Sequence, residues 1–260
     1  MPRNEFFTGL LVLGCVNGFA ARVISSVNEL GWVEALLRTF DISVIALLAC
    51  LVGMELIFRI KPQEADSVRS SDIAVGAAYL LLVALPISGL SWLAVTILSF
   101  YLLFFVSGPS SRRRGAVVLL ALTVPMLWSR LLFQFWANSI LAIDASFVGW
   151  ILRTNRTGNM VGFADSSGTL VILPPCSSLA NVSLAILCWV TISQLVRHRW
   201  SLVDVLWCLL ACVSVIAVNV ARICLMGLNG SHYNAMHNTW GDTVANVIIL
   251  SLTVGTACWE

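Results

Sequence analysis

Residues 202–224 read LVDVLWCLLACVSVIAVNVARIC, an apolar run whose only charges, Asp204 and Arg222, lie near its ends. The run is about as long as the roughly 20 apolar residues that an α-helix needs to cross a membrane. Lipid offers the backbone no hydrogen-bond partners, so a crossing segment is expected to be helical. The run therefore predicts a membrane-spanning helix.

Similar runs extend over most of the chain, at 6–27, 41–60, 73–89, 91–107, 115–136, 177–196 and 240–258. Of the 260 residues, 59% are hydrophobic and 11% are charged, whereas about 25% of the residues of a soluble domain are charged. We therefore predict an all-α polytopic membrane protein with about eight transmembrane helices. We expect a single integral membrane domain (1–260), made of five N-terminal helices (1–136), an extracytoplasmic segment (137–175) and a three-helix part (176–260) that holds the candidate catalytic residues discussed below.

The basic residues predict that both termini face the cytoplasm. With the N-terminus inside, nine basic residues fall in cytoplasmic segments and five in outer ones, as the positive-inside rule requires. The cytoplasmic group is Arg3, Arg59, Lys61, Arg69, Arg112, Arg113, Arg114, Arg197 and Arg199. The outer connections are then 28–40, a turn at 88–91, the long segment 137–175 and a loop at 228–239.

The long segment 137–175 is expected to carry a small β-like element before the sixth helix. Its first part, 137–152, is either an amphipathic surface helix or an extension of the fifth span, and 154–159 has a turn-like composition. Two short apolar runs, Met160–Ala164 and Thr169–Leu173, are divided by Asp-Ser-Ser-Gly and predict a β-hairpin. Pro174 and Pro175 then end the hairpin and start the next helix.

Cys176, Arg222 and His237 lie at the ends of three apolar runs, and the span count places all three on the outer face. Cys176 is expected at a helix N-terminus, where N–H groups and the helix dipole favour a thiolate. Neighbouring free amides could also hold an oxyanion. An Arg in apolar sequence usually faces a polar cavity, and His serves as general acid or base near neutral pH. Together they provide the groups of cysteine acyl transfer.

Each of these residues also has a simpler interpretation: a Cys near a helix cap, an Arg that reaches the headgroups, and a surface His. The secondary candidates are Asn219, which could orient Arg222, Ser177, His232 as the rival of His237, Asp242 and the intramembrane Arg130. Asp242 could orient a catalytic His or compensate a helix N-terminus. Arg130 could have a structural or a substrate-channel role. Asp144, Asp165, Arg153 and Arg156 could recognise a substrate.

The order of three motifs resembles the exosortase/archaeosortase family of membrane cysteine transpeptidases. The motifs are Cys176-Ser177-Ser178, Asn219-Val220-Ala221-Arg222-Ile223 and His237-Asn238-Thr239-Trp240-Gly241, within residues 150–245. The family usually has Gly where this chain has Ser178. The resemblance implies a protease/transpeptidase that cleaves C-terminal sorting signals (PEP-CTERM-like) of exported proteins through a thioacyl intermediate and transfers them to an acceptor.

The implied partners are membrane-anchored proteins that end in a short motif, an apolar helix and a basic tail. The enzyme would lie in the cell (inner) membrane with its site facing the periplasm or exterior. The alternatives are a small-molecule or ion transporter and a non-catalytic membrane assembly factor. The eight Cys contain no CxxC pair, and we predict no metal, no cofactor and no nucleic-acid partner. The sequence leaves the oligomeric state, the sorting motif and the acceptor open.

Overall fold

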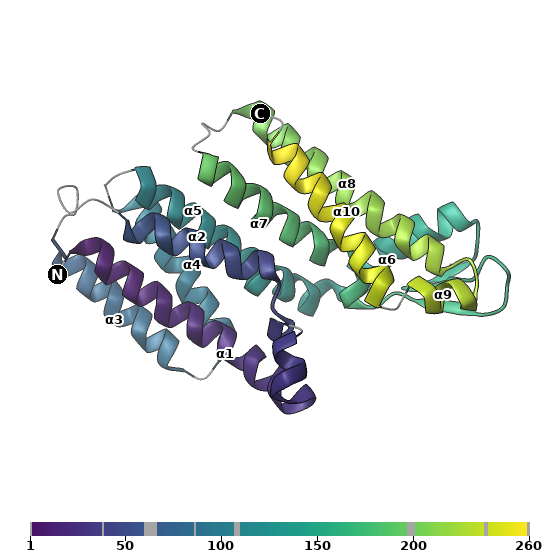
Figure 1. Ribbon diagram of the computed structural model, residues 1–260, viewed down its shortest axis with the longest axis horizontal. Helices are drawn as coiled ribbons and strands as arrows, with labels where there is room; N and C mark the ends of the chain where they lie inside the picture. Colours follow the sequence, from purple (N-terminus) through teal and green to yellow (C-terminus); the bar gives the residue numbers. More distant parts are fainter. Residues whose placement is uncertain are drawn as a thin grey trace. The chain divides into compact units, whose positions relative to one another are not determined.

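The computed structural model describes residues 2–37, 39–59, 67–85, 87–106, 110–196, 201–236 and 239–258. The described chain is mostly helical, with one small sheet (Figure 1). It divides into two compact units, Met1–Leu127 with Ser193–His198, and Trp128–Ile192 with Arg199–Glu260. Each unit is described by itself.

The first unit is built from helices α1 to α5. Their bounds are α1 Arg3–Leu37, the short 3-10 turn η1 Thr39–Asp41, α2 Val44–Phe58, α3 Ser70–Ala84, α4 Ser88–Phe104 and α5 Ser110–Thr123. Helix α5 packs against α2 and α4, and α1 packs against α2, α3 and α4. A Cβ added to Gly115 of α5 would lie 2.6 Å from the carbonyl oxygen of Gly53 on α2. Small residues therefore let these two backbones approach closely, as in many membrane helix pairs.

Two predicted connections of the first unit are wrong in position. The segment 28–40 was expected to be a loop, but α1 continues to Leu37 and bends at Gly31, where φ is 77°. The turn expected at 88–91 lies earlier, because α4 already begins at Ser88 and α3 ends at Ala84. Around Ser88 the apolar composition is nearly continuous, so the hydrophobic pattern did not mark the end of the preceding helix.

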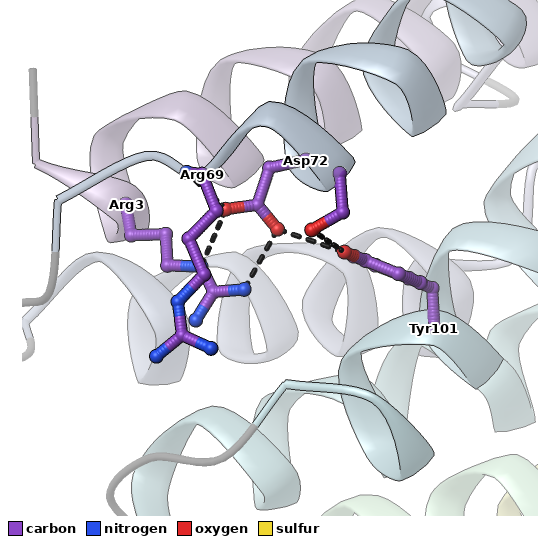
Figure 2. Close-up of polar contacts among 5 residues, drawn as sticks. Arg3, Arg69, Asp72 and Tyr101 are labelled. Atoms are coloured by element: carbon purple, nitrogen blue, oxygen red, sulfur yellow. Dashed lines mark hydrogen bonds and ion pairs between the residues drawn. The ribbon is translucent and has the colours of Figure 1, made fainter.

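A buried polar cluster joins α1, α3 and α4 at one end of the first unit (Figure 2). Arg3 donates from Nε and Nη2 to the two carboxylate oxygens of Asp72, at 2.6 and 2.7 Å. The hydroxyl of Tyr101 also donates to Asp72, at 2.9 Å, and so does the backbone N–H of Arg69, at 2.8 Å. Arg3 and Asp72 are 1% and 0% exposed. Arg3 therefore forms a compensated buried ion pair, not an exposed cytoplasmic charge.

The second unit contains the rest of the described elements. They are α6 Ser129–Leu152, β1 Arg156–Thr157, β2 Met160–Gly162, β3 Thr169–Val171, the 3-10 turn η4 Pro174–Cys176, α7 Ser178–Val196, α8 Leu202–Met226, α9 Gly230–Met236 and α10 Thr239–Cys258. The last residues of α7 belong to the first unit. A π-turn, η3 (Val124–Trp128), precedes α6 and contains Pro125, which has no N–H for a regular helix bond. The alternative that made 137–152 an extension of the fifth span is confirmed, with a kink at Trp136.

The predicted β-hairpin is confirmed, and it carries one strand more than expected. Strands β2 and β3 pair antiparallel, with Met160 opposite Val171. Strand β1 adds to the other edge of β2 and occupies part of the stretch 154–159 that was expected to be a turn. The backbone N–H of Ala164 donates to the carbonyl of Gly227 at 2.9 Å, which ties the hairpin to the end of α8. The predicted loop 228–239 contains the short helix α9.

The core of the second unit lies between α6, the sheet and α8. Its buried side chains are Leu141, Ala145, Val148, Val161, Leu170, Ile172, Val220, Ile223, Cys224 and Met226. Helix α10 packs along the side of α8, and α9 packs against both of them (Figure 1). This core lies beside the start of α7 and the end of α8, which carry the candidate site.

The lengths and compositions of the helices indicate a membrane-embedded protein. In the described part of the chain, four helical stretches are long and apolar enough to cross a membrane: Arg3–Leu37, Ser110–Leu152, Ser178–Val196 and Leu202–Met226. Shorter apolar helices lie at Val44–Phe58, Ser70–Ala84, Ser88–Phe104 and Val244–Ala257. Large apolar side chains also cover much of the surface, such as Leu202, which is 84% exposed. A lipid environment accounts for such exposure.

Candidate functional site

Cys176 lies in a tight turn between the sheet and α7. The turn η4 forms because Pro174 fixes its own φ, and the N–H groups of Cys176 and Ser177 donate to the carbonyls of Leu173 (2.9 Å) and Pro174 (3.1 Å). Helix α7 begins at Ser178. Cys176 was expected at the N-terminus of this helix, and it lies in the turn two residues before the helix begins. The turn therefore places Cys176 just before the N-terminus of α7.

The backbone amides around Cys176 are already used inside the protein. The N–H of Ser178 donates to Oδ2 of Asp144 at 3.0 Å, and the N–H of Leu179 donates to Oγ of Ser177 at 3.2 Å. With the two turn bonds, all four amides from Cys176 to Leu179 have acceptors. The sequence suggested that free amides near Cys176 could hold an oxyanion, and the amides of residues 176–179 are not free to do so.

The Cys176 side chain is half-buried and packs against the core of the second unit. It carries a thiol and is not half of a disulfide. Its contact with the core restricts how the sulfur can move.

Asn219 of α8 ties the Cys176 turn to two helices. Its Nδ2 donates to the carbonyl of Cys176 at 2.8 Å and to Oγ of Ser178 at 3.1 Å. Its Oδ1 accepts from Nδ2 of Asn181 on α7 at 3.0 Å. Asn219 is 1% exposed, and a buried amide in an apolar helix is costly unless it is hydrogen-bonded. We expected Asn219 to orient Arg222, but the amide holds the turn that carries the thiol.

Ser178 stands where the family that the sequence resembles usually has Gly. Its side chain takes part in this hydrogen-bond network. Its side chain is 5% exposed and accepts the bond from Asn219. The additional hydroxymethyl group therefore points to α8. Ser177, the neighbouring secondary candidate, is fully buried and accepts the Leu179 N–H. Both serines shape the turn.

Arg222 lies one turn beyond Asn219 on α8 and is half-buried. It lines a pocket of about 430 Å³ formed by α8, the end of α9 and the start of α10. The other lining residues are Val218, Ala221, Leu225, Met236, Gly241, Val244, Ala245 and Ile248. Among the lining residues that the structure describes, Arg222 is the one that carries a charge. The pocket thus combines a cation with apolar walls.

The remaining candidates lie in different places. His237 lies outside the described residues, and Asp242 is in the first turn of α10, where its side chain is not described. His232 is exposed on α9, and its Nδ1 lies 2.9 Å from Oδ1 of Asn229. Arg130 is exposed at the start of α6, about 20 Å along the helix from Asp144, which contacts the Cys176 turn. The structure therefore joins Cys176, Ser177 and Asn219 and leaves Arg130 apart.

Two residues of this network were not selected from the sequence as members of the site. Asp144 was considered as a possible substrate contact, and it caps α7 instead. Asn181 was not considered, although it is a carboxamide inside an apolar run. A polar side chain in a membrane helix is itself a functional signal, and both residues carry that signal. In the described residues, no three His, Cys, Asp or Glu side chains group together as a metal site would require.

When the chain was compared with protein-family models, curated proteins and solved structures, nothing matched. The chemistry of the site is therefore inferred from its own residues and contacts.

Gly241→Ala should displace the segment that joins α9 to α10 and includes His237. A Cβ at position 241 would lie 2.3 Å from the carbonyl oxygen of Met236 and 2.8 Å from its Cα. Because these atoms belong to the backbone, the segment itself has to move, at a cost of about 1–3 kcal/mol. Thermal unfolding in detergent measures this loss as a lower Tm.

Gly255→Ala in the same helix is the matched control. A Cβ there meets nothing within 4 Å, so the free energy of unfolding should stay the same or rise by about 0.4–1 kcal/mol. Equal stability of the Gly241→Ala protein and the wild type would show that the close approach at Met236 does not constrain this segment.

Proposed function

We propose that this protein is a membrane-embedded cysteine protease/transpeptidase that cleaves C-terminal sorting signals of exported proteins. The observation that carries the proposal is the bond from Asn219 to the carbonyl of Cys176. It fixes the turn of a partly exposed thiol to the helix that carries Arg222. The buried carboxamide is fully hydrogen-bonded and fixes the position of the cysteine turn, as the nucleophile of a covalent reaction requires.

The reaction follows the general course of acyl transfer by a thiol. His237 takes the proton of the Cys176 thiol, and the thiolate attacks the carbonyl carbon of the scissile peptide and forms a tetrahedral oxyanion. The C–N bond then breaks, His237 gives a proton to the departing amine, and a thioacyl enzyme remains. His237 next takes a proton from the acceptor, which attacks the thioester and releases Cys176. The acceptor is another nucleophile or water.

In this scheme Arg222, and not the backbone amides of residues 176–179, stabilises the oxyanion. The amides of residues 176–179 already donate within the protein. The guanidinium is the remaining described cation on the helix that holds the turn, and a fixed positive group at a developing oxyanion lowers the barrier. Arg222 is therefore proposed as the stabiliser of the thiolate and the oxyanion.

The pocket beside Arg222 suits an apolar substrate segment. Its walls are side chains such as Val218, Leu225 and Ile248. The proposed substrates end in an apolar helix with a basic tail, and the scissile bond lies next to that helix. The apolar end of the substrate would lie against the pocket while the motif extends toward Cys176. The protein is placed in the cell membrane, N-in and C-in, with the site on the outer face.

His237→Gln should lower the cleavage of a reporter substrate by about 10²–10⁴-fold, the usual contribution of a general acid–base group. The reporter is a protein from the same genome that ends in a short motif, an apolar helix and an Arg-rich tail, expressed together with the enzyme. Cleavage is measured as the fraction of shortened reporter in the membrane, by gel and by mass spectrometry of the new C-terminus.

His232→Gln is the matched control, because His232 lies five residues earlier and is exposed beside Asn229. Its cleavage should equal that of the wild type. A loss with His232→Gln alone would transfer the acid–base role to His232. Full cleavage by both single variants and by the double variant would reject the proposed function.

A further inference from the structure

The second half of α6, residues 137–152, has a buried face and an exposed face. The buried face packs into the second unit and consists of Leu141, Asp144, Ala145, Val148 and Gly149. The opposite face is exposed and consists of Ile143, Phe147, Trp150 and Ile151. Residues three and four apart lie on the same side of a helix, so these four side chains form one continuous stripe. We call this stripe the exposed α6 face.

The exposed α6 face is not composed like the surface of a helix in water. Asp144 is the one charged residue between positions 137 and 152, and it lies on the buried side. Trp150, by contrast, is 80% exposed. A helix at a water surface normally presents charged and polar side chains there, and a contiguous apolar patch marks contact with a partner or a membrane. The face therefore needs an apolar environment.

The length of the helix indicates that this environment is lipid. The helical stretch Ser110–Leu152 has 43 residues, and at 1.5 Å per residue its contour is about 64 Å. The hydrocarbon core of a bilayer is about 30 Å thick, and the predicted fifth span, 115–136, already accounts for that thickness. The kink of α6 falls at Trp136, at the end of this span. Exposed aromatic side chains, Phe135 and Trp136, continue the apolar surface of the span up to the kink.

Charge complementarity indicates phospholipid in particular. Arg153 caps the C-terminus of α6 and Arg156 begins β1, and both are exposed. The Arg156 side chain reaches back along α6, where its Nη1 donates to the carbonyl of Ala142 at 3.4 Å. Helices that lie in a membrane interface combine an apolar stripe rich in Trp, Phe and Leu with cations that meet the lipid phosphates. The segment 137–156 contains both parts.

We propose that the exposed α6 face is a phospholipid-binding surface and that helix 137–152 lies in the membrane interface beyond the fifth span. Its apolar stripe enters the boundary between headgroups and acyl chains, to a depth of about 5–10 Å. Arg153 and Arg156 then meet the phosphates. Asp144 on the buried side accepts the Ser178 N–H, so this helix also holds the Cys176 turn close to the headgroups.

The test uses the full-length wild-type protein in vesicles of phosphatidylcholine and phosphatidylglycerol. A trace of phospholipid with a diazirine on its acyl chain is included, and light attaches this lipid to the groups that it touches. Fragment-ion mass spectrometry of the peptide between Arg130 and Arg153 locates the adducts. Adducts are expected on the exposed α6 face as well as on the residues before Trp136.

Hydroxyl-radical oxidation of the same vesicles provides the complementary measurement. Trp150 should lose most of the oxidation that it shows in the free tryptic peptide, because lipid covers it. His232, which is exposed on α9, should keep its oxidation. Adducts confined to residues before Trp136, together with a fully oxidised Trp150, would place the face in water and overturn the proposal. A protected Trp150 without adducts would also overturn it and would assign the face to a second copy of the chain, which chemical cross-linking detects as a dimer.

The double variant Arg153→Gln with Arg156→Gln tests the contact with the headgroups. The yield of α6 adducts from a diazirine phosphatidylglycerol is divided by the yield from the matching phosphatidylcholine. In the wild type this ratio should exceed one by up to about fivefold for each arginine, and the double variant should bring it close to one. Arg113→Gln, which removes an exposed cation of α5, is the matched control and should leave the ratio unchanged. A wild-type ratio of one would overturn the role of the two arginines.

This surface does not depend on the proposed function. Lipid adducts and oxidation need no substrate, no acceptor and no reactive thiol. Uncleaved reporter would leave the adducts on α6 as they are, and absent adducts would leave cleavage as it is. The two proposals can therefore fail separately.

Discussion

Cys176→Ala is expected to lower cleavage of the sorting-signal reporter by about 10⁴-fold or more, the order of loss when a covalent catalyst is deprived of its nucleophile. The physical reason is that acyl transfer requires the sulfur at one place. The turn that holds it is fixed by Asn219 and by Asp144 through Ser178. The measurement is the time course of reporter shortening in isolated membranes.

Cys176→Ser tests the same point with a smaller change. The hydroxyl is a much weaker nucleophile near neutral pH than the thiol, so cleavage should remain far below that of the wild type while the turn is kept. Cys212→Ala, a half-buried cysteine on α8, is the matched control and should cleave normally. The Cys176→Ser and Cys212→Ala proteins should both reach wild-type abundance in the membrane. Normal cleavage by Cys176→Ala would end the proposal of a cysteine peptidase and favour a transporter or an assembly factor.

The second large effect concerns stability. Asp72→Ala should lower the free energy of unfolding by about 3–5 kcal/mol, the usual cost of removing one partner of a buried ion pair. The substitution removes the acceptor of two bonds from Arg3, one from Tyr101 and one from the Arg69 backbone (Figure 2). For a chain of this size, the loss corresponds to a fall in Tm of roughly 10 °C.

Two further variants show which interaction accounts for the loss of stability in Asp72→Ala. Glu55→Gln breaks the exposed ion pair between Glu55 and Arg59 on α2, and such pairs contribute only about 0–1 kcal/mol. Its Tm should hardly change. The double variant Arg3→Met with Asp72→Leu should recover most of the stability, because buried ion pairs can often be replaced by apolar residues. An Asp72→Ala protein that unfolds at the wild-type temperature would show that the cluster does not support the first unit.

The helices were predictable because lipid-crossing segments need long apolar runs and little else. Their ends were less so, since the end of a helix depends on tertiary packing and local backbone geometry. Around Gly31 the composition suggested a loop, but a single positive φ lets α1 bend and continue. At Ser88 the apolar pattern gave no signal, and the link lies one turn earlier. The hairpin was found because two apolar runs flank a typical turn sequence.

The site was only partly predictable, because its contacts join residues that are far apart in the chain. Cys176 and Asn219 could be selected by motif, but the bond between them spans 43 positions. The role of Asp144 depends on α6 passing beside the start of α7, which no local pattern encodes. Arg3 was counted as an orientation signal, although its charge is paired inside the protein. His237 lies outside the described residues, so its role stays a prediction.

The Arg3–Asp72 pair also has a consequence for biogenesis. The two residues are 69 positions apart, and a ribosome adds about 5–20 residues per second. The cation is therefore made roughly 3–14 s before its counter-ion. During that interval the first helix has to be retained by the insertion machinery or by lipid headgroups. A nascent chain arrested before residue 72 should be extracted from the membrane more easily than one arrested after α3 has emerged.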